Sequence, residues 1–187
     1  MIEKVKIFRD GVFSLHTRRF GTVAELIMLE KYSLSGNTKN QHHDATDKDG
    51  KRIEIKFSRV IKENPFTINK HNLLKQTVES STSSRAVKSK DMYDTKFDCN
   101  IQQIKREEFD RLLYGLFFAD KIAVFELSNK EVMKVQGYSD FQHKGNKGEG
   151  QFHVNNDTID YHMKTHFKEW ITYEDVINMF NKYSKDE

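Results

Sequence analysis

The side chains best suited to chemistry are two carboxylates and one ammonium that lie close together in the sequence. Asp44 is followed, after nine residues, by the triplet Glu54-Ile55-Lys56. Carboxylates are hard oxygen ligands suited to Mg²⁺, which they bind at about 2.0–2.1 Å while the ion keeps several waters. A lysine ammonium beside them can orient or deprotonate a water and offset negative charge on a phosphate. These residues predict metal-assisted phosphodiester hydrolysis that leaves a 5′-phosphate and a 3′-hydroxyl, with the Ile55 carbonyl as a further candidate ligand.

A β-hairpin has to bring these side chains onto one face. Alternation along a strand places Glu54 and Lys56 on the same side and leaves the reverse side apolar. Asp44 joins them only if the hairpin loop has an odd number of residues, because a two-residue turn would pair the next residue with Glu54. We therefore expect a three-residue loop, residues 48–50, with Gly50 at positive φ. That register pairs Asp44 with Glu54. The apolar side of the strand consists of Ile53, Ile55 and Phe57.

A helix is expected just before the hairpin. Apolar residues between Thr22 and about Tyr32 have the spacing of an amphipathic helix. Thr22 and Glu25 have the spacing of a capping box, in which each side chain hydrogen-bonds the backbone of the other residue. The cap by itself accounts for Glu25.

The rest of the chain alternates predicted strands and helices. Strands are expected over residues 97–104, 121–127 and 132–138, of which the second is central. Helices are expected over residues 109–117, 157–170 and 173–183. Thr172 is the expected cap of the last helix. The serine-rich segment 65–89 predicts a mobile loop with little order.

The aspartate and the Glu54-Ile55-Lys56 triplet, placed behind a leading helix, resemble the PD-(D/E)XK nuclease superfamily. Most type II restriction endonucleases belong to this superfamily, and the resemblance covers about residues 21–127. His43 stands where the family pattern has proline, a departure that touches no ligand. The resemblance implies a restriction-endonuclease-like α/β fold with a mixed central sheet of about five strands flanked by helices. It also implies catalysis by Asp44 and the triplet with Mg²⁺, and it offers Glu25 a second role, because the glutamate of the family's leading helix sometimes assists a second metal.

Positive charge is concentrated in one segment, although the whole chain carries a net charge of only +3. Residues 51–90 hold ten basic and three acidic side chains, a net charge of +7, which favours a polyanion as partner. A solvated basic face is the alternative interpretation. The candidates for contacts to DNA phosphates, which position DNA without reading its sequence, are Arg59, Lys62, Lys70 and Lys75.

The glycine-rich loop at residues 143–156 offers side chains that can hydrogen-bond base edges in the major groove. Its glycines would let the backbone approach DNA. The alternative interpretation is a flexible hairpin end without a role in readout. The candidates for sequence readout are Lys144, Lys147, Gln151, His153 and Asn155.

A chain of 187 residues fits one nuclease domain. The catalytic core is expected over about residues 21–127, and the remainder, about 128–187, is expected to hold DNA-recognition and helical elements. One domain holds one site, whereas cleavage of both DNA strands needs two. A homodimer on palindromic double-stranded DNA is therefore the simplest expectation, and a small cleaving subunit beside a different DNA-reading partner is the alternative.

The single cysteine and the N-terminal sequence bear on the compartment. Cys99 excludes an internal disulfide and is expected to be buried in a strand. The first residues, MIEKVKIFRD, lack the apolar stretch of a signal peptide, and no segment has the roughly 18 apolar residues of a membrane span. We therefore expect a cytoplasmic protein without a membrane partner.

Other functions are open at this point. A repair or recombination nuclease with the same site would recognise DNA shape, and a non-catalytic DNA-binding module would use the hairpin charges only to face phosphates. His162 and His166 have the spacing of two zinc ligands on a helix, but the glutamate of an HExxH motif is missing, so packing of the helix is the expected role.

Overall fold

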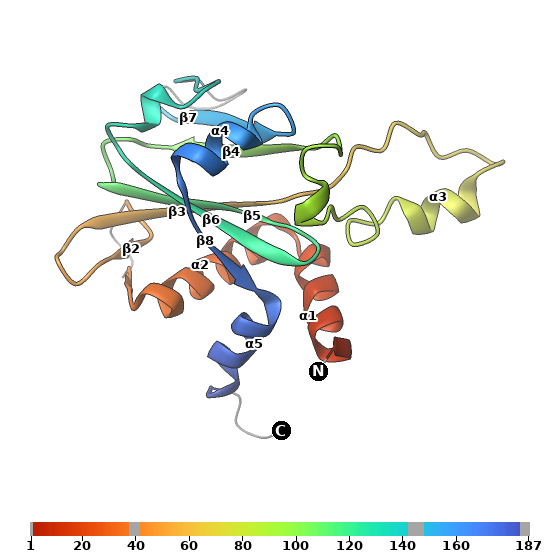
Figure 1. Cartoon of the computed structure of the whole chain (residues 1–187), viewed down its shortest axis with the longest axis horizontal. Coiled ribbons are helices and arrows are strands. Elements are labelled where there is room, and N and C mark those ends of the chain that lie inside the picture. The colour runs from red at the N-terminus through yellow and green to blue at the C-terminus, as the bar shows by residue number, and fades with distance from the viewer. Residues whose placement is uncertain (1, 38–41, 142–147, 184–187) are drawn as a thin grey trace.

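The computed structural model describes residues 2–37, 42–141 and 148–183. Within these ranges the chain forms a mixed α/β fold with a six-stranded sheet, a two-stranded sheet and five α-helices (Figure 1). The expected α/β class and mixed sheet are confirmed, with one strand more in the main sheet than expected. No helix in the described ranges is long and apolar enough to span a membrane.

The main sheet has the order β1-β2-β3-β5-β6-β8. The strands are β1 (Ser35–Gly36), β2 (Ala45–Thr46), β3 (Arg52–Arg59), β5 (Arg111–Phe117), β6 (Lys121–Ser128) and β8 (Phe167–Thr172). β3 and β5 are parallel, and the other neighbours are antiparallel. Because β2 is only two residues long, most of one edge of β3 is left without a strand partner among the described residues.

The central strand β5 replaces the helix expected over residues 109–117, so that prediction was wrong. All residues from Leu112 to Phe117 are buried, with β3 on one side and β6 on the other. A strand covered on both faces has no polar alternation, and its apolar run also fits the spacing of a buried helix. The strand expected over residues 121–127 is confirmed as β6.

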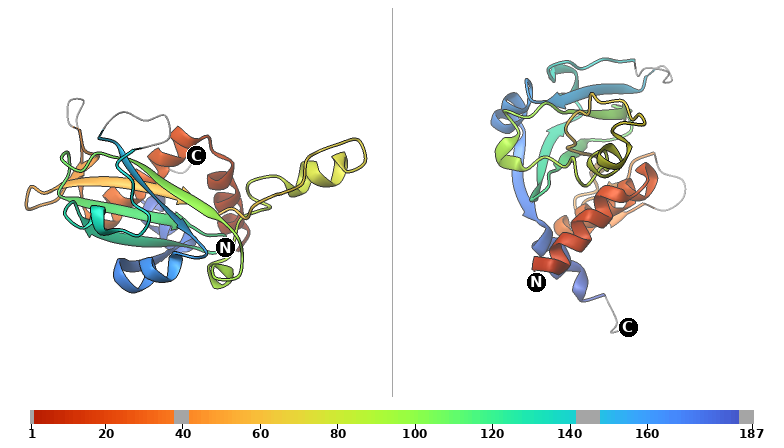
Figure 2. Two further views of the ribbon diagram at one scale, coloured as in Figure 1. Left: turned by 90° about the horizontal axis from the view of Figure 1, so that it is seen from above. Right: turned by 90° about the vertical axis from the view of Figure 1, so that its right-hand side faces the viewer.

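Two layers cover the two faces of the main sheet (Figure 2). One face packs against α1 (Ile2–Ser14), α2 (Thr17–Tyr32) and α5 (Tyr173–Asn181). The other face packs against the two-stranded sheet of β4 (Asp98–Ile104) and β7 (Gly150–Asn155), with α4 (Ile159–Thr165). Helices therefore flank the sheet fully on one side, and a β-ribbon with one short helix flanks it on the other.

Helix α2 begins at Thr17, so the predicted capping box at Thr22 was wrong. Thr22 lies inside the helix, where its Oγ1 donates to the Arg18 carbonyl at 3.2 Å. A threonine within a helix satisfies its hydroxyl in this way instead of capping. Helix capping therefore does not explain the presence of Glu25. At the other end of the chain, the expected cap of α5 is confirmed, because Thr172 and Asp175 form a capping box.

Three other segments differ from the predicted elements. Residues 65–89, expected to have little order, contain α3 (Leu73–Glu79) on an arm that projects from the body (Figures 1 and 2). The strand expected over residues 132–138 is a short 3₁₀ helix, η2 (Val132–Lys134). The helix expected over residues 157–170 stops at Thr165, because β8 follows and pairs with the edge of β6. The open edge of a strand can form hydrogen bonds with a further strand, and the spacing of apolar residues along the sequence does not reveal this.

We predict that Gly115→Ala destabilises the fold by about 2–3 kcal/mol. A Cβ at this position in β5 would lie 2.4 Å from the Ala123 carbonyl oxygen and 2.1 Å from the Phe57 ring. The backbone carbonyl cannot move without disturbing β6. Urea unfolding of both proteins measures the loss.

Gly11→Ala is the matched control for this substitution. A Cβ at Gly11 in α1 meets nothing within 4 Å, so the higher helix propensity of alanine should raise stability by up to about 1 kcal/mol. Equal stabilities of Gly115→Ala and the wild type would contradict the close packing of β5 against β6.

Candidate active site

The hairpin loop between β2 and β3 has the predicted length. The Asp47 amide donates to the Lys51 carbonyl at 3.1 Å, which encloses the three residues 48–50. Gly50 has φ +79°, as expected for the left-handed residue of such a loop. Asp47 Oδ1 also accepts the amides of Asp49 and Lys51 at 2.9 Å. The odd loop length sets the register that the polar face requires.

This register brings Asp44 beside the Glu54-Ile55-Lys56 triplet. Ala45 pairs with Ile53, so Asp44, the residue just before β2, lies opposite Glu54. The Asp44 amide donates to the Ile53 carbonyl at 3.0 Å, and Asp44 Oδ2 accepts the Ile55 amide at 2.8 Å. The aspartate side chain thus takes the place of a strand partner at the point where β2 begins.

The Ile55 carbonyl faces the same open edge. In a β-strand the N–H and C=O groups of one residue point to the same side. The Ile55 N–H points to Asp44, so the Ile55 carbonyl points to the same edge of β3. This is the position that the sequence analysis gave to a further metal ligand.

Lys56 lies between the two carboxylates. Its Nζ is 2.5 Å from Glu54 Oε1 and 3.8 Å from Asp44 Oδ2. The Glu54 side chain is only 8% exposed, whereas Asp44 is 31% exposed and opens to the solvent. The three residues predicted from spacing therefore form one charged cluster, with the glutamate at its floor.

Burial shifts the pKa values within this cluster. Burial raises the pKa of Glu54 to about 7, Asp44 adds to the rise, and Lys56 opposes it. Burial alone would lower the pKa of Lys56, but attraction to Glu54 and Asp44 outweighs it and the net shift is upward. The attraction does not satisfy Glu54 fully, because its Oε2 is buried without a hydrogen-bond partner among the described residues. A second cation would satisfy that oxygen.

Glu25 faces the same cluster from α2. Burial raises the pKa of Glu25, Asp44 contributes in the same direction, and Lys56 acts against both. These interactions place its carboxylate within electrostatic reach of the cluster. Glu25 is thus not part of the predicted helix cap, and its role at the site stays a prediction.

A cleft of about 740 Å³ lies above these residues, between α2, β3 and β4. Its wall on the β4 side consists of Ile101 and three residues with amide side chains, none of which was predicted from the sequence. The three amide residues are Asn100, Gln102 and Gln103. The polar alternation of residues 98–102 signalled an exposed strand face, but only the tertiary fold places that face opposite Asp44 and Glu25.

The donor set fits a hard divalent cation. Within the described ranges no three His, Cys, Asp or Glu side chains lie close enough together to form a complete metal site. Asp44, Glu54 and the Ile55 carbonyl nevertheless supply three oxygens at one edge, one of them the unsatisfied Glu54 Oε2. Oxygen ligands and room for several waters are what Mg²⁺ requires.

The predicted phosphate contacts are dispersed. Arg59 lines the cleft, but its Nη1 donates to the Phe13 and Leu15 carbonyls at 2.7 Å, and the guanidinium lies over the Phe20 ring. Arg59 thus ties β3 to the end of α1, which leaves less of it for a phosphate. Lys75 lies in α3 on the projecting arm (Figure 1), Lys70 precedes that helix by three residues, and Lys62 follows the end of β3 by three residues. Lys144 and Lys147 fall outside the described residues.

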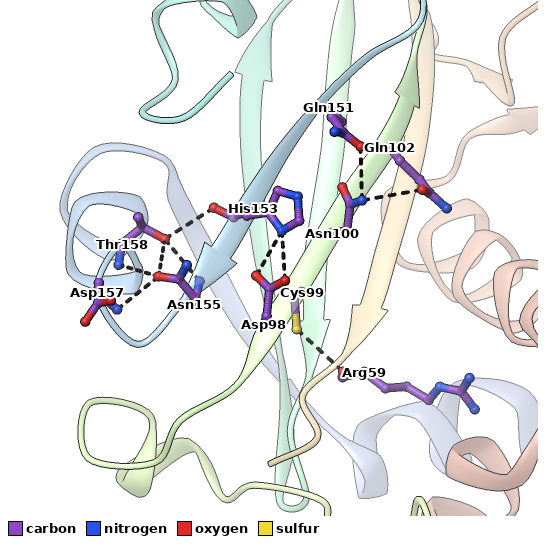
Figure 3. A network of polar contacts seen from close by, with 10 residues as sticks. All are labelled: Arg59, Asp98, Cys99, Asn100, Gln102, Gln151, His153, Asn155, Asp157 and Thr158. Carbon is purple, nitrogen blue, oxygen red and sulfur yellow. Dashed lines mark hydrogen bonds and ion pairs between the residues drawn. The ribbon is translucent and has the colours of Figure 1, made fainter. Parts of the chain in front are cut away.

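The other predicted readout residues lie on β7 and make contacts of their own (Figure 3). Gln151 Oε1 accepts from Asn100 at 3.1 Å, and His153 Nδ1 lies 2.9 Å from the Asp98 carboxylate. Asn155 Oδ1 accepts the amides of Asp157 and Thr158, in the turn that leads into α4. Gln151 and His153 lie on the outer face of the ribbon, whereas Asn155 holds a turn.

The remaining candidates are structural, as expected. His162 is fully buried, and its Nδ1 lies 2.8 Å from the Tyr114 hydroxyl. Burial, with a contribution from His166, lowers the pKa of His162 to about 4, so the ring stays neutral. Cys99 is a buried residue of β4, and burial raises the pKa of its thiol to about 12. Neither residue contributes a nucleophile.

No protein-family model matches the chain, and no curated protein sequence is similar to it. The resemblance to the PD-(D/E)XK nucleases therefore rests on the residues of this chain and their arrangement.

We predict that Glu54→Gln gains stability relative to the wild type as the pH rises. The folded wild type keeps a proton on Glu54 up to a pH of about 7, whereas the unfolded chain releases it near the ordinary pKa of 4.5. The contribution of Glu54 to the free energy of unfolding is therefore fully present below pH 4.5 and is lost as the pH rises through 7. Thermal unfolding in EDTA should show the variant about 2–6 °C more stable at pH 8 than at pH 5, relative to the wild type.

Glu79→Gln is the control, because Glu79 is an exposed residue of α3 whose only ion pair is the 4.0 Å contact with Lys75 among the described residues. It should show the same difference from the wild type at both pH values. A Glu54→Gln curve parallel to the wild-type curve would contradict the burial of an ionisable carboxylate.

We predict that Asn155→Ala lowers stability by about 1 kcal/mol, because two amides before α4 lose their acceptor. Gln151→Ala, on the same strand, should leave stability within about 0.5 kcal/mol of the wild type. Urea unfolding measures both. Unchanged stability of Asn155→Ala combined with weakened DNA binding would restore the readout role of this residue.

Proposed function

We propose that the chain is a Mg²⁺-dependent DNA endonuclease of the PD-(D/E)XK type that cuts double-stranded DNA at a specific sequence, as type II restriction endonucleases do. The observation that carries the proposal is the cluster of Asp44, Glu54 and Lys56 at the open edge of β3, where one buried carboxylate oxygen has no hydrogen-bond partner among the residues that the structure describes. A mixed sheet with its catalytic carboxylates at the edge of a hairpin agrees with the restriction-endonuclease-like fold that the resemblance implies.

Asp44, Glu54 and the Ile55 carbonyl would hold the metal. Bound there, Mg²⁺ would lower the pKa of a coordinated water and neutralise charge on the phosphate. The Asp44 carboxylate is already fixed by the Ile55 amide, so little conformational freedom would be lost on binding. The rigid edge of β3 thus sets the position of the scissile phosphate.

Lys56 acts as a cation in this scheme. Its raised pKa keeps the ammonium protonated at neutral pH, where it orients the attacking water and offsets charge that develops on phosphorus. The proton of the water then needs another acceptor. Glu25 lines the cleft and has a raised pKa, which suits a general base. Water attacks phosphorus while Glu25 takes its proton, the P–O3′ bond breaks, and the leaving 3′-oxygen takes a proton from solvent, so the products carry a 5′-phosphate and a 3′-hydroxyl.

Each chain provides one such cluster, and cleavage of both strands requires two. A homodimer on a palindromic site is the simplest assembly that supplies them. A small cleaving subunit bound to a different DNA-reading protein would meet the same requirement. The homodimer is part of the proposal. Sedimentation of the protein bound to DNA that contains its cleavage site distinguishes the homodimer from a complex with a different DNA-reading protein.

Lys56→Ala should reduce cleavage of plasmid and phage DNA by at least about 10²-fold, because a preorganised charge at the reacting phosphate is lost. The measurement is a gel of DNA incubated with Mg²⁺ or with EDTA. The wild type should give discrete fragments with Mg²⁺ only, and DNA ligase should rejoin them if their ends are 5′-phosphate and 3′-hydroxyl.

Lys164→Ala is the matched control, because Lys164 is an exposed residue of α4 paired with Asp160 and lies outside the cleft. It should cut as the wild type does. Cleavage confined to branched DNA would instead identify a repair or recombination nuclease. Binding of DNA in EDTA without cleavage by the wild type under any salt condition would identify a non-catalytic DNA-binding module.

A further inference from the structure

A stretch of β4 rich in amide residues lies across the cleft from the carboxylates. Asn100, Gln102 and Gln103 of β4 line the same cavity as Glu25, Asp44 and Lys56. Gln102 and Gln103 are exposed, and Asn100 is half-buried. These amides belong to neither the charged cluster nor the hydrophobic core. A ligand held by the carboxylates would lie against them.

A β-bulge directs these side chains. β4 and β7 pair at Ile101 with Phe152 and again at Ile104 with Gly150, so two residues of β4 stand opposite the single residue Gln151. Bulges near active sites change the direction in which side chains point. The bulge therefore adds an extra side chain, Gln103, to the exposed edge of the ribbon.

The backbone of Gln103 is in the left-handed region, with φ +60°. Outside glycine this conformation is unfavourable, and such residues concentrate at functional sites. The bulge does not need a glutamine for its geometry, because glycine adopts this conformation more readily. A strained glutamine at the mouth of the cleft points to a role for its side chain.

Hydrogen bonds hold the neighbouring amides in place. Asn100 Nδ2 donates to Gln151 Oε1 at 3.1 Å and lies 3.5 Å from Gln102 Oε1, and Figure 3 shows the three side chains together on the ribbon. A two-stranded ribbon fits the major groove of DNA, and Asn or Gln amides pair with N6 and N7 of adenine. These amides therefore have both the support and the chemistry for base readout.

We propose that the β4 bulge is the sequence-reading element and that Gln103 is a specificity-determining residue that binds adenine in the major groove. The amides of Asn100, Gln102 and Gln151 support it or read the neighbouring base pair. This inference rests on the proposed nuclease function. It moves the centre of readout from the glycine-rich loop to the strand that faces the catalytic cluster.

Gln103→Gly separates the side chain from the backbone, because glycine suits φ +60° and removes only the amide. The test selects bound sequences from a library of randomised DNA duplexes in Mg²⁺, with Lys56→Ala as the non-cleaving parent. The parent should enrich a motif that contains adenine, and adding Gln103→Gly should reduce the preference at one adenine position about tenfold or more. The melting temperature should stay equal or rise.

Two further probes sharpen the test. Replacing the selected adenine by 7-deazaadenine, which lacks the N7 acceptor, should weaken binding by the parent but not by the Gln103→Gly variant. Gln103→Asn, which keeps an amide and tolerates positive φ, should retain part of the preference. Gln151→Ala should weaken the motif without abolishing it.

The outcomes distinguish this inference from the proposed function. A motif unchanged by Gln103→Gly, or no motif at all from the parent while the wild type still cuts DNA with Mg²⁺, would overturn the readout role and leave the nuclease standing. Neither binding nor cleavage of DNA by any of the proteins would overturn the nuclease proposal, and the inference with it.

Discussion

The hydrogen bond from the Ile55 amide to Asp44 Oδ2 is the interaction on which the site depends. β2 begins at Ala45, so the Ile55 amide in the middle of β3 has no strand partner on that side among the described residues and is satisfied by a side chain instead. An amide left unpaired at this point would cost about 1–3 kcal/mol if buried. The same contact fixes Asp44 beside Glu54 and Lys56 and keeps the edge of β3 open for a ligand.

The rest of the fold holds β3 rigid behind this edge. β5 pairs with β3 along its whole length in parallel, and Gly115 of β5 lets the Phe57 ring lie against the neighbouring backbone. Arg59 ties the end of β3 to the α1–α2 connection through the Phe13 and Leu15 carbonyls. The charged cluster is thus supported from behind by β5 and at the end of the strand by the half-buried Arg59 guanidinium, while its front faces the cleft.

Electrostatics at the charged cluster lower the stability of the folded chain, and in the proposed function a bound cation would relieve them. The Glu54 carboxylate is 8% exposed, its pKa is raised to about 7, and one of its oxygens has no partner within the described part of the chain, so its charged form is unfavourable in the folded chain at neutral pH. Lys56 compensates only in part, because it interacts with two carboxylates at once. Such conflicts concentrate at functional sites, where a group is held ready for a ligand rather than for the fold.

The sequence by itself determined the parts of this protein that depend on local geometry. Strand alternation placed Glu54 with Lys56, the parity of the loop at Gly50 set the register of Asp44, and β6 and the cap of α5 followed from local patterns. Long-range pairing decided what local patterns could not. β5 was mistaken for a helix because burial on both faces removes alternation, and β8 forms because the edge of β6 requires a partner. The packing of the β4–β7 ribbon over the sheet brought Asn100, Gln102 and Gln103 opposite the carboxylates. These residues are more than 40 positions from the carboxylates in the sequence, and the two groups become neighbours only because hydrophobic faces on separate elements are buried together.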